Sequence, residues 1–256
     1  MLFDRQRQLL ALLDAFGGAV EDRDLHHLVA LYGRPYDFVP QPFGAFSFTA
    51  AADRLTLIAR GFLIDRRGWH LTDAGRAASA RDLLMIEFAQ RTGQRGEALA
   101  AEVRAKLKRV VTSATLATIG YEGKSLERYL NDLTGASITL LCDVRRNPLS
   151  RKYGFSKTTL ANGCEAVGLR YTHLPELGIA SEERRDVKSQ ADRDALFATY
   201  TRGLQTRRET IAKIIHGIEE GERVALTCFE LLPEDCHRHC LAELLERELG
   251  CTATHL

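Results

Sequence analysis

Apolar and polar residues alternate differently in the two parts of the chain. Up to about residue 111 the apolar positions recur at helical spacing, as in Leu9, Leu12, Leu13 and Phe16. From Leu116 onward, short apolar runs alternate with helical patterns, which is typical of a parallel sheet. We therefore predict an α/β fold, in which residues 113–256 form a Rossmann-like parallel-sheet domain with helices on both faces.

The second part of the chain carries the signals of five strands. Strands are predicted at 116–121, 138–145, 170–175 and 223–229, of which 138–145 and 223–229 are expected to be buried, and 251–255 is a candidate edge strand. Helices are expected from Ser125 to about 133, over 157–167, over 195–219, and from Cys236 to Glu248, with Asp235 as the N-cap of the last one. The charged run 178–195 lacks an apolar stripe and is predicted to be a mobile lid.

The first part of the chain predicts three short helices and a hairpin. The helices are expected at 4–16, 24–32 and 49–60, and the hairpin at 62–71 with its turn near Arg66 and Arg67. This layout resembles the winged helix-turn-helix domains that precede several bacterial regulatory and defence-associated modules. We assign residues 1–75 to this domain and 76–112 to connecting helices.

A winged helix would read DNA with helix 49–60 in the major groove and with its wing on phosphate. The basic candidates for this contact are Arg54, Arg60, Arg66 and Arg67. A wing that contacts protein and forms a homodimer is the alternative, because helix 49–60 is rich in alanine and has few basic groups. Fold alone does not decide between them.

Polar residues gather where the predicted strands end. Because the carboxyl ends of parallel strands share one edge of a sheet, we expect these side chains to form one site. The candidates for catalysis are Asp143, His173, Cys228, Glu230, Cys236 and His237. The candidates for ligand binding are Gly120, Tyr121, Glu122, Gly123, Arg145, Ser150, Lys152 and Arg238.

Three kinds of chemistry fit this set of residues. Cys228 or Cys236 could be a nucleophile activated by a histidine or a helix N-terminus. Zinc could bind Cys228, Cys236, Cys240 and His237 or His239, but no Cys-x-x-Cys pair is present.

The third and favoured interpretation is a pocket for a phosphorylated or nucleotide-like anion, clamped by Arg145, Lys152 and Arg238. A structural ion pair of Asp143 with Arg145 or Arg238 is the plain alternative. We predict no metal and no cofactor.

Four separated motifs resemble one family. They are Thr118-Ile-Gly-Tyr-Glu-Gly, Asp143-Val-Arg-x-x-Pro-x-Ser150, Tyr171-x-His-Leu-Pro-Glu-Leu-Gly178, and Cys228-x-Glu230 followed by Cys236-His-Arg238. In this order they match the domain-of-unknown-function 488 (DUF488) family over about residues 116–246. The resemblance implies a common site and no particular reaction. The chain also resembles rhodanese domains more loosely. It lacks the short loop with which those domains bind a persulfide.

Composition narrows the classes of function. The 256 residues carry a formal net charge of +1, so strong non-specific nucleic-acid binding is not expected. No apolar run approaches about 18 residues, which predicts no membrane span. Six cysteines without a signal-peptide layout predict reduced thiols and a cytoplasmic protein.

These observations lead to one favoured function and one alternative. The favoured function is a ligand-responsive regulator related to defence or stress, whose α/β domain binds the anion and whose winged helix binds DNA. The alternative is an enzyme that acts on a nucleotide or nucleic-acid substrate, with Cys228, Glu230 and Asp143 in its active site.

Overall fold

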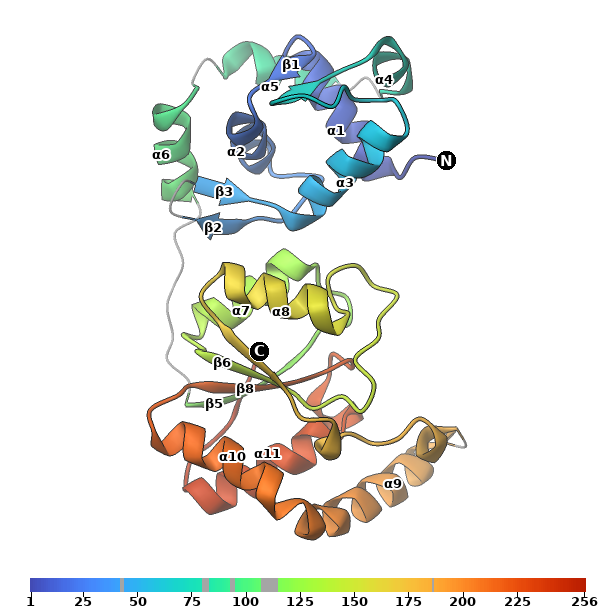
Figure 1. Cartoon of the computed structure of the whole chain (residues 1–256), viewed down its shortest axis with the longest axis vertical. Helices are drawn as coiled ribbons and strands as arrows, with labels where there is room; N and C mark the ends of the chain where they lie inside the picture. The colour runs from blue at the N-terminus through green and yellow to red at the C-terminus, as the bar shows by residue number, and fades with distance from the viewer. Residues whose placement is uncertain (42–43, 80–82, 93–94, 107–114, 186) are drawn as a thin grey trace. The chain divides into compact units, whose positions relative to one another are not determined.

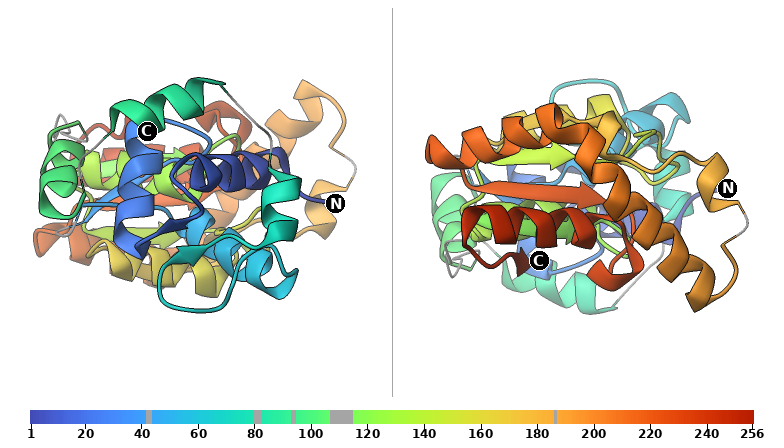
Figure 2. Two further views of the ribbon diagram at one scale, coloured as in Figure 1. Left: turned by 90° about the horizontal axis from the view of Figure 1, so that it is seen from above. Right: turned by 90° about the horizontal axis from the view of Figure 1, so that it is seen from below.

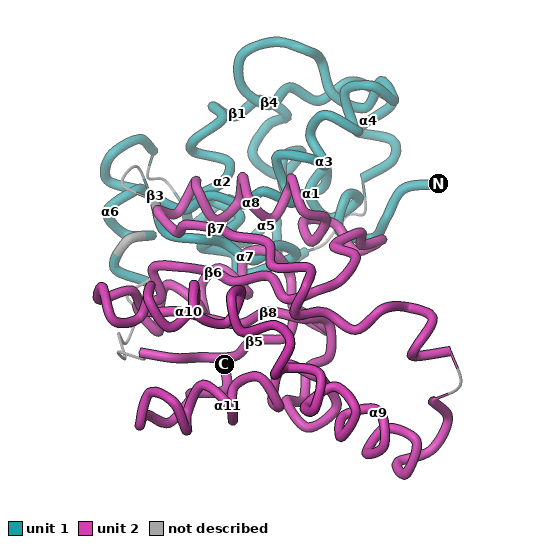
Figure 3. The backbone as a smooth tube through the Cα atoms, turned by 60° about the horizontal axis from the view of Figure 1, so that its bottom comes forward, with its two compact units in different colours: residues 1–109 teal, residues 110–256 magenta. Residues whose placement is uncertain are grey.

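The computed structural model divides the chain into two compact units, residues 1–109 and 110–256 (Figures 1 and 3). It describes residues 1–41, 44–79, 83–92, 95–106, 115–185 and 187–256. Within these ranges, no helix combines the length and the apolar character that crossing a membrane requires. Each unit is described by itself below.

The first unit is mostly helical. Its first three helices are α1 (Asp4–Ala15), α2 (Asp22–Tyr32) and α3 (Phe48–Ala59). Strand β1 (Ala19–Val20) pairs antiparallel with β4 (Trp69–His70), and an antiparallel bridge joins Leu63 to Leu71. A second ladder, β2 (Val39–Gln41) with β3 (Gly44–Phe46), lies in the aromatic stretch between α2 and α3.

The remaining helices of the first unit share its core. They are α4 (Asp73–Ala78), α5 (Leu83–Arg91) and α6 (Glu97–Lys106). Met85 of α5 and Leu99 and Val103 of α6 are fully buried in the same hydrophobic cluster as the leucines of α1 and α2. The segment predicted to connect the two domains therefore supplies part of this core.

A buried carboxylate fixes α3 to α1. Asp53 accepts hydrogen bonds from Arg5 Nε at 2.7 Å, from Gln6 Nε2 at 2.7 Å and from the Tyr36 hydroxyl at 2.9 Å. These partners offset the cost of burying the charge. The first helix and the aromatic stretch therefore hold α3 from two sides.

The second unit is built on a five-stranded parallel sheet. The strands are β5 (Leu116–Gly120), β6 (Leu140–Asp143), β7 (Arg170–His173), β8 (Val224–Cys228) and β9 (Thr254–His255), in the order β7-β6-β8-β5-β9. All four strand pairings are parallel. The predicted α/β fold is confirmed.

Helices cover both faces of this sheet. Helices α7 (Leu126–Gly135) and α8 (Lys157–Ala166) lie on one face, while α10 (Arg208–Glu219) and α11 (Arg238–Leu249) lie on the other (Figures 1 and 2). The neighbouring strands β6 and β8 therefore lead into helices on opposite faces, α8 and α11. Such a switch point leaves a crevice at the carboxyl ends of the strands.

Two helix starts differ from the prediction. Helix α9 (Gln190–Gly203) begins inside the charged run, because Ser189 and Asp192 form a capping box. A 3₁₀ turn, η2 (Glu182–Arg184), precedes it. Helix α11 begins at Arg238 rather than Cys236, since Pro233–Asp235 form another 3₁₀ turn, η4. Asp235 pairs with Arg193 and does not cap α11.

Candidate functional site

The end of β6 is held by a buried ion pair. Arg145 donates to the two carboxylate oxygens of Asp143, from Nε at 2.8 Å and from Nη2 at 2.5 Å. The Tyr171 hydroxyl donates to the same carboxylate at 2.7 Å. Burial lowers the pKa of Arg145, but the hydrogen bond and charge of Asp143 outweigh it and raise this pKa. Asp143 and Arg145 therefore form the structural ion pair that was predicted as the alternative to ligand binding by Arg145.

Arg145 makes two further side-chain hydrogen bonds. Its Nη1 donates to the Tyr121 hydroxyl at 3.0 Å and to the Phe155 carbonyl at 2.8 Å. The rings of Tyr121 and Phe155 are stacked, with centroids 4.4 Å apart. His173 Nε2 donates to the Arg145 carbonyl at 2.9 Å. His173 thus supports the backbone at the end of β6.

The glycine-rich turn after β5 packs against the segment that follows β8. A Cβ on Gly120 would lie 1.8 Å from the Glu230 carbonyl oxygen, so only glycine permits this approach. The amides of Tyr121 and Glu122 both donate to the Phe229 carbonyl. The Glu122 carboxylate accepts from the Leu231 amide at 3.0 Å. These contacts engage the backbone amides of Tyr121 and Glu122, two of the residues predicted to bind a ligand.

Gly123 lies in the left-handed region with φ of 73°, which favours glycine at the end of this turn. The loop after β6 is organised by its own polar groups. The Ser150 hydroxyl accepts from the Lys152 amide at 3.1 Å, and Lys152 Nζ donates to the Tyr121 carbonyl at 3.0 Å. Partial burial lowers the pKa of Lys152. Ser150 and Lys152 therefore shape the loop.

Cys228, Cys236 and His237 form a thiol–imidazole cluster at the end of β8. His237 Nδ1 lies 3.9 Å from Cys228 Sγ and 3.8 Å from Cys236 Sγ. Its Nε2 donates to the Val144 carbonyl at 3.1 Å. A carbonyl oxygen can only accept, so in the neutral ring Nδ1 is the nitrogen without a proton. That nitrogen faces both thiols, and each of the three residues is 1% exposed.

The two thiols of this cluster differ in acidity. A hydrogen bond from Cys236, with His237 and Arg184 nearby, holds the pKa of Cys228 well below its usual range. Burial and the adjacent Cys228 raise the pKa of Cys236. Burial also raises the pKa of Glu230. By contrast, burial raises the pKa values of Cys142 and Cys164 to about 12, so these two thiols are inert.

The side chain of Arg238 donates hydrogen bonds to backbone carbonyl groups. It is 1% exposed, and its Nη1 and Nη2 donate to the carbonyls of Glu230 at 2.5 Å and Leu231 at 2.9 Å. The first residue of α11 thereby fixes the segment that follows β8. Arg145 and Arg238, two members of the clamp predicted with Lys152, therefore both hold the walls of the site through hydrogen bonds within the protein.

Two neighbouring cavities open at the strand ends and together form what we call the strand-end cleft. One, of about 340 Å³, is lined by the loop after β6 and by the end of β8, Cys228 included. The other, of about 370 Å³, reaches His237, Asp235 and helix α9. Ile179, Arg184, Phe229 and Glu230 line both cavities.

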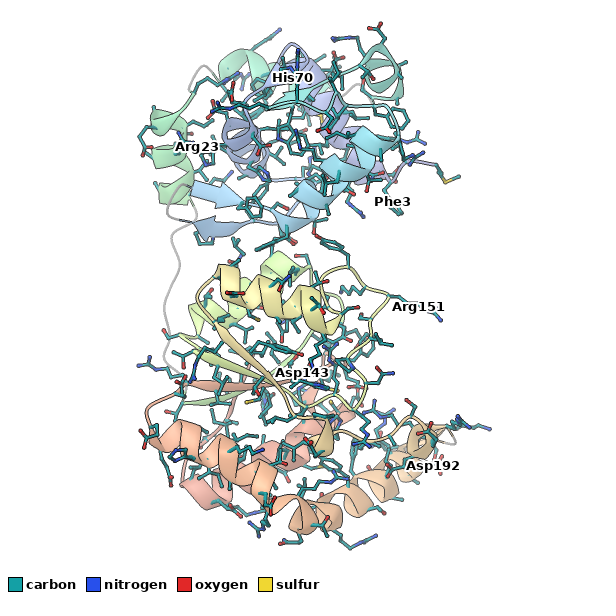
Figure 4. The ribbon with its side chains drawn as sticks, in the orientation of Figure 1. Phe3, Arg23, His70, Asp143, Arg151 and Asp192 are labelled. Carbon is teal, nitrogen blue, oxygen red and sulfur yellow. The ribbon has the colours of Figure 1, made fainter. Side chains whose placement is uncertain are left out.

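Seven of the fourteen catalytic and ligand-binding residues predicted at the strand ends line this cleft. Tyr121, Arg145, Ser150, Cys228 and Glu230 line the first cavity, and Glu122, Glu230 and His237 line the second. In Figure 4, Asp143 lies inside the second unit, whereas Arg151 points outward from its loop.

Four residues of this region were not among the predicted site residues. Arg184, whose side chain is about one-third exposed, lies 3.7 Å from Glu230 Oε1 and 3.5 Å from His237 Nδ1, but it falls in the charged run predicted to be a lid. Phe229 sits between Cys228 and Glu230 and was not considered. Tyr200 packs edge-on to His237. Tyr171 belongs to a quoted motif, whose Tyr-x-His spacing after a strand was its available signal.

In the first unit, two of the four predicted DNA contacts are bound to backbone. Arg54 Nη2 donates to the carbonyls of Arg66 and Gly68, and Arg60 Nη1 donates to the Met1 carbonyl. Arg66 and Arg67 lie exposed on the loop before β4. Arg66 Nη2 lies 2.7 Å from His70 Nδ1, and His70 Nε2 donates to the Arg67 carbonyl at 2.8 Å.

The comparisons with known proteins bear on the second unit. No curated protein and no solved structure matches the chain. The winged-helix and rhodanese resemblances find no confirmation in them. Residues 125–245 match the family model described as Domain of unknown function DUF488. This range contains three of the four quoted motifs, Asp143–Ser150, Tyr171–Gly178 and Cys228–Arg238, and the fourth lies just before it. The chain therefore carries a DUF488 domain at residues 125–245.

Proposed function

We propose that the DUF488 domain binds a phosphorylated, nucleotide-like anion in the strand-end cleft. The observation that carries this proposal is the charge of the 340 Å³ cavity. Four arginines line it, and Glu230 is the one carboxylate among its described lining residues. The arginines are Arg145, Arg146, Arg151 and Arg184. Guanidinium groups are the side chains best suited to bidentate contact with phosphate.

The ligand's counter-charge comes from three of these arginines. Arg145 is already neutralised by Asp143. Arg146 donates one hydrogen bond, from Nη1 to the Pro175 carbonyl at 3.3 Å, and the side chain of Arg151 is exposed. Arg184 faces Glu230 across 3.7 Å, a separation that gives only a weak ion pair, and its contact from Nη2 to His237 Nδ1 is also long at 3.5 Å.

An aromatic surface lies beside this charge. Phe229 is 43% exposed although it packs edge-on to Tyr121, with ring centroids 5.3 Å apart. It lines both cavities of the cleft. Exposed aromatic rings stack on nucleobases, and the volume of each cavity is within the range of ligand pockets. A phosphate next to a planar apolar group therefore fits the cleft.

For the first unit we propose DNA binding by a winged helix. The supporting observation is the exposure of Arg66 and Arg67 together on the loop before β4. Arg54 and Arg60 act indirectly in this proposal, because they hold the loop and the N-terminal segment. Binding of the anion in the second unit would then regulate DNA occupancy.

The second candidate is an enzyme that acts on a nucleotide or nucleic-acid substrate. Cys228 favours it, because this thiol lines the same cavity as the arginines. Glu230 would lie beside the reacting group. Asp143 is fully used by Arg145 and Tyr171, so it would position the site without touching the substrate.

Native mass spectrometry of the full chain purified from cells tests the proposal. We expect a retained small molecule whose mass and fragments contain phosphate, and its loss from the Arg151→Gln, Arg184→Gln variant. A retained molecule that turns over on incubation selects the enzyme. Retention of uncharged molecules only, or equal retention by the arginine variant, contradicts an anion site.

A further inference from the structure

We infer that Cys228, Cys236 and His237 form a metal site of the kind that binds Zn²⁺. The ligand atoms of these three residues all lie within 4.8 Å of one another. Among the described residues, this group brings two thiols and one imidazole close enough together to hold one metal ion. This metal site differs from the prediction that the chain binds no metal.

The separations fit a tetrahedral ion. With Zn–S near 2.3 Å and Zn–N near 2.0 Å, tetrahedral ligands stand roughly 3.6 Å apart for sulfur to nitrogen and about 3.8 Å apart for sulfur to sulfur. His237 Nδ1 lies 3.9 Å and 3.8 Å from the two sulfurs. Small side-chain shifts are enough to close the three ligands on one ion.

The imidazole is already in the form that binds metal. His237 Nε2 donates to the Val144 carbonyl, which leaves the lone pair of Nδ1 directed at the thiols. Metal-binding histidines almost always donate their other ring N–H to a carboxylate, a carbonyl or water in this way. Tyr200 packs against the ring and restricts its rotation.

The surroundings suit a thiophilic ion. The three residues are 1% exposed, and two thiolates balance the charge of a divalent cation, so the bound cluster is neutral inside the protein. The thiols release their protons to solvent on binding. Thiolate and imidazole ligands favour zinc and disfavour magnesium and calcium.

A fourth coordination position faces the cleft. Cys228 lines one cavity and His237 the other, while Glu230 lines both. The Glu230 Oε2 atom is buried and has no hydrogen-bond partner in the described part of the chain. Arg184 Nη2, 3.5 Å from His237 Nδ1, has to withdraw when the metal takes that nitrogen. We assign this position to an exchangeable ligand, with Glu230 beside it.

The inference does not depend on the anion proposed above. It rests on the thiols and the imidazole, whereas the anion proposal rests on the arginines of the cavity. A metal measurement and an anion measurement therefore fail independently of each other.

Cobalt and zinc titrations of the full chain test the inference. The chain is reduced, treated with a chelator and freed of it before either metal alone is added. We expect one ion per chain, a thiolate-to-cobalt charge-transfer band with the intensity of two thiolates, and the strong visible bands of tetrahedral Co²⁺. Zinc should bleach both features by competition.

Two cysteine variants separate this cluster from other thiols. Cys228→Ser removes a ligand and should weaken zinc binding by roughly tenfold or more, because even the loss of a group that only supports a metal ligand has about this effect. Cys240→Ser is the matched control, because Cys240 is also buried on α11 next to an imidazole, with its Sγ 3.4 Å from His239 Nε2. Its cobalt spectrum and zinc affinity should equal those of the unchanged chain.

Several results would overturn the inference. They are no stoichiometric zinc binding by the reduced chain, a cobalt spectrum without thiolate character, or equal weakening by Cys240→Ser. A Cys228–Cys236 disulfide that persists under reduction also contradicts it. Circular dichroism without metal shows whether Cys228→Ser folds. The cobalt spectra of the unchanged chain and of Cys240→Ser decide the question if it does not.

Discussion

Arg145 closes on Asp143, two residues earlier in the chain, through two parallel hydrogen bonds of 2.8 Å and 2.5 Å. Both side chains are buried, Asp143 completely. The pair fixes the end of β6 and the start of the loop that lines the cleft. In the proposed anion site, the charge of the ligand is therefore left to Arg146, Arg151 and Arg184.

Breaking this pair should destabilise the second unit. Asp143→Asn keeps the shape but leaves the Arg145 guanidinium buried without a counter-charge, which costs about 3–5 kcal/mol of unfolding free energy. Denaturant unfolding followed by circular dichroism measures it. Glu182→Gln is the control, because Glu182 is exposed on η2 and its change should stay within about 0.5 kcal/mol. A loss below about 1 kcal/mol for Asp143→Asn would show that the pair is dispensable.

Gly120 should resist substitution. In Gly120→Ala the new Cβ would lie 1.8 Å from the Glu230 carbonyl oxygen, so the segment after β8 has to move. We expect a loss of about 1–3 kcal/mol, the usual cost of overpacking. Gly135→Ala is the control, since a Cβ there meets nothing within 4 Å and alanine suits a helix. Equal thermal stability of both variants would contradict the close packing of β5 and β8.

The stability of the first unit should fall at acidic pH because His26 is buried. Burial lowers the pKa of His26 from 6.5 to about 4, while Asp22 opposes this shift and His27 adds to it. Between these two values the unfolded chain binds a proton that the folded chain does not, so the free energy of unfolding falls as pH is lowered through this window. The full effect is on the order of 3 kcal/mol.

Thermal unfolding between pH 7 and pH 4 measures this dependence. His26→Gln removes the titrating group and should flatten the curve in that window, whatever its stability at pH 7. His26 also stacks on Phe46 and accepts from the Ser47 amide, so the variant is compared by slope and not by absolute stability. Identical slopes for the two chains would rule out the buried neutral ring.

DNA binding by the first unit should depend on the loop before β4. Replacing Arg66 and Arg67 by alanine should weaken binding to any duplex and reduce the salt dependence of log K by roughly 2, one unit for each phosphate contact. Arg91→Ala is the control, because Arg91 is highly exposed on α5 and is not among the residues predicted to contact DNA. Fluorescence anisotropy across a salt series gives both quantities. Absence of binding by the intact chain at low salt would end the DNA proposal.

Local pattern was enough to predict the sheet. Strands β5, β6 and β8 are largely apolar runs between polar or turn residues, and their ends at Gly120, Asp143 and Cys228 fall within about two residues of the predicted boundaries. That the residues at the strand ends meet at one edge of the sheet follows from parallel strands alone. The match of residues 125–245 to the DUF488 model agrees with the motifs quoted from the sequence.

The roles of individual side chains could not be read from the sequence in the same way. Whether Arg145 serves Asp143 or a ligand depends on rotamers and on Tyr171, which arrives from another strand. Arg184 was expected to face solvent because the residues around it in the sequence are charged. The approach of Cys228 and Cys236 depends on the turn η4, which no standard metal-binding spacing encodes.

Calorimetric titration of the full chain with inorganic pyrophosphate tests the central claim most directly. The account predicts saturable binding that the Arg151→Gln, Arg184→Gln variant weakens about tenfold to a hundredfold, the equivalent of roughly 1.4–2.8 kcal/mol for lost charged hydrogen bonds. Arg185→Gln is the matched control, because Arg185 is the exposed neighbour of Arg184 and lines neither cavity. Unchanged affinity in that control confirms the assignment. No binding by the unchanged chain, or equal weakening by Arg185→Gln, would contradict an anion site in the cleft.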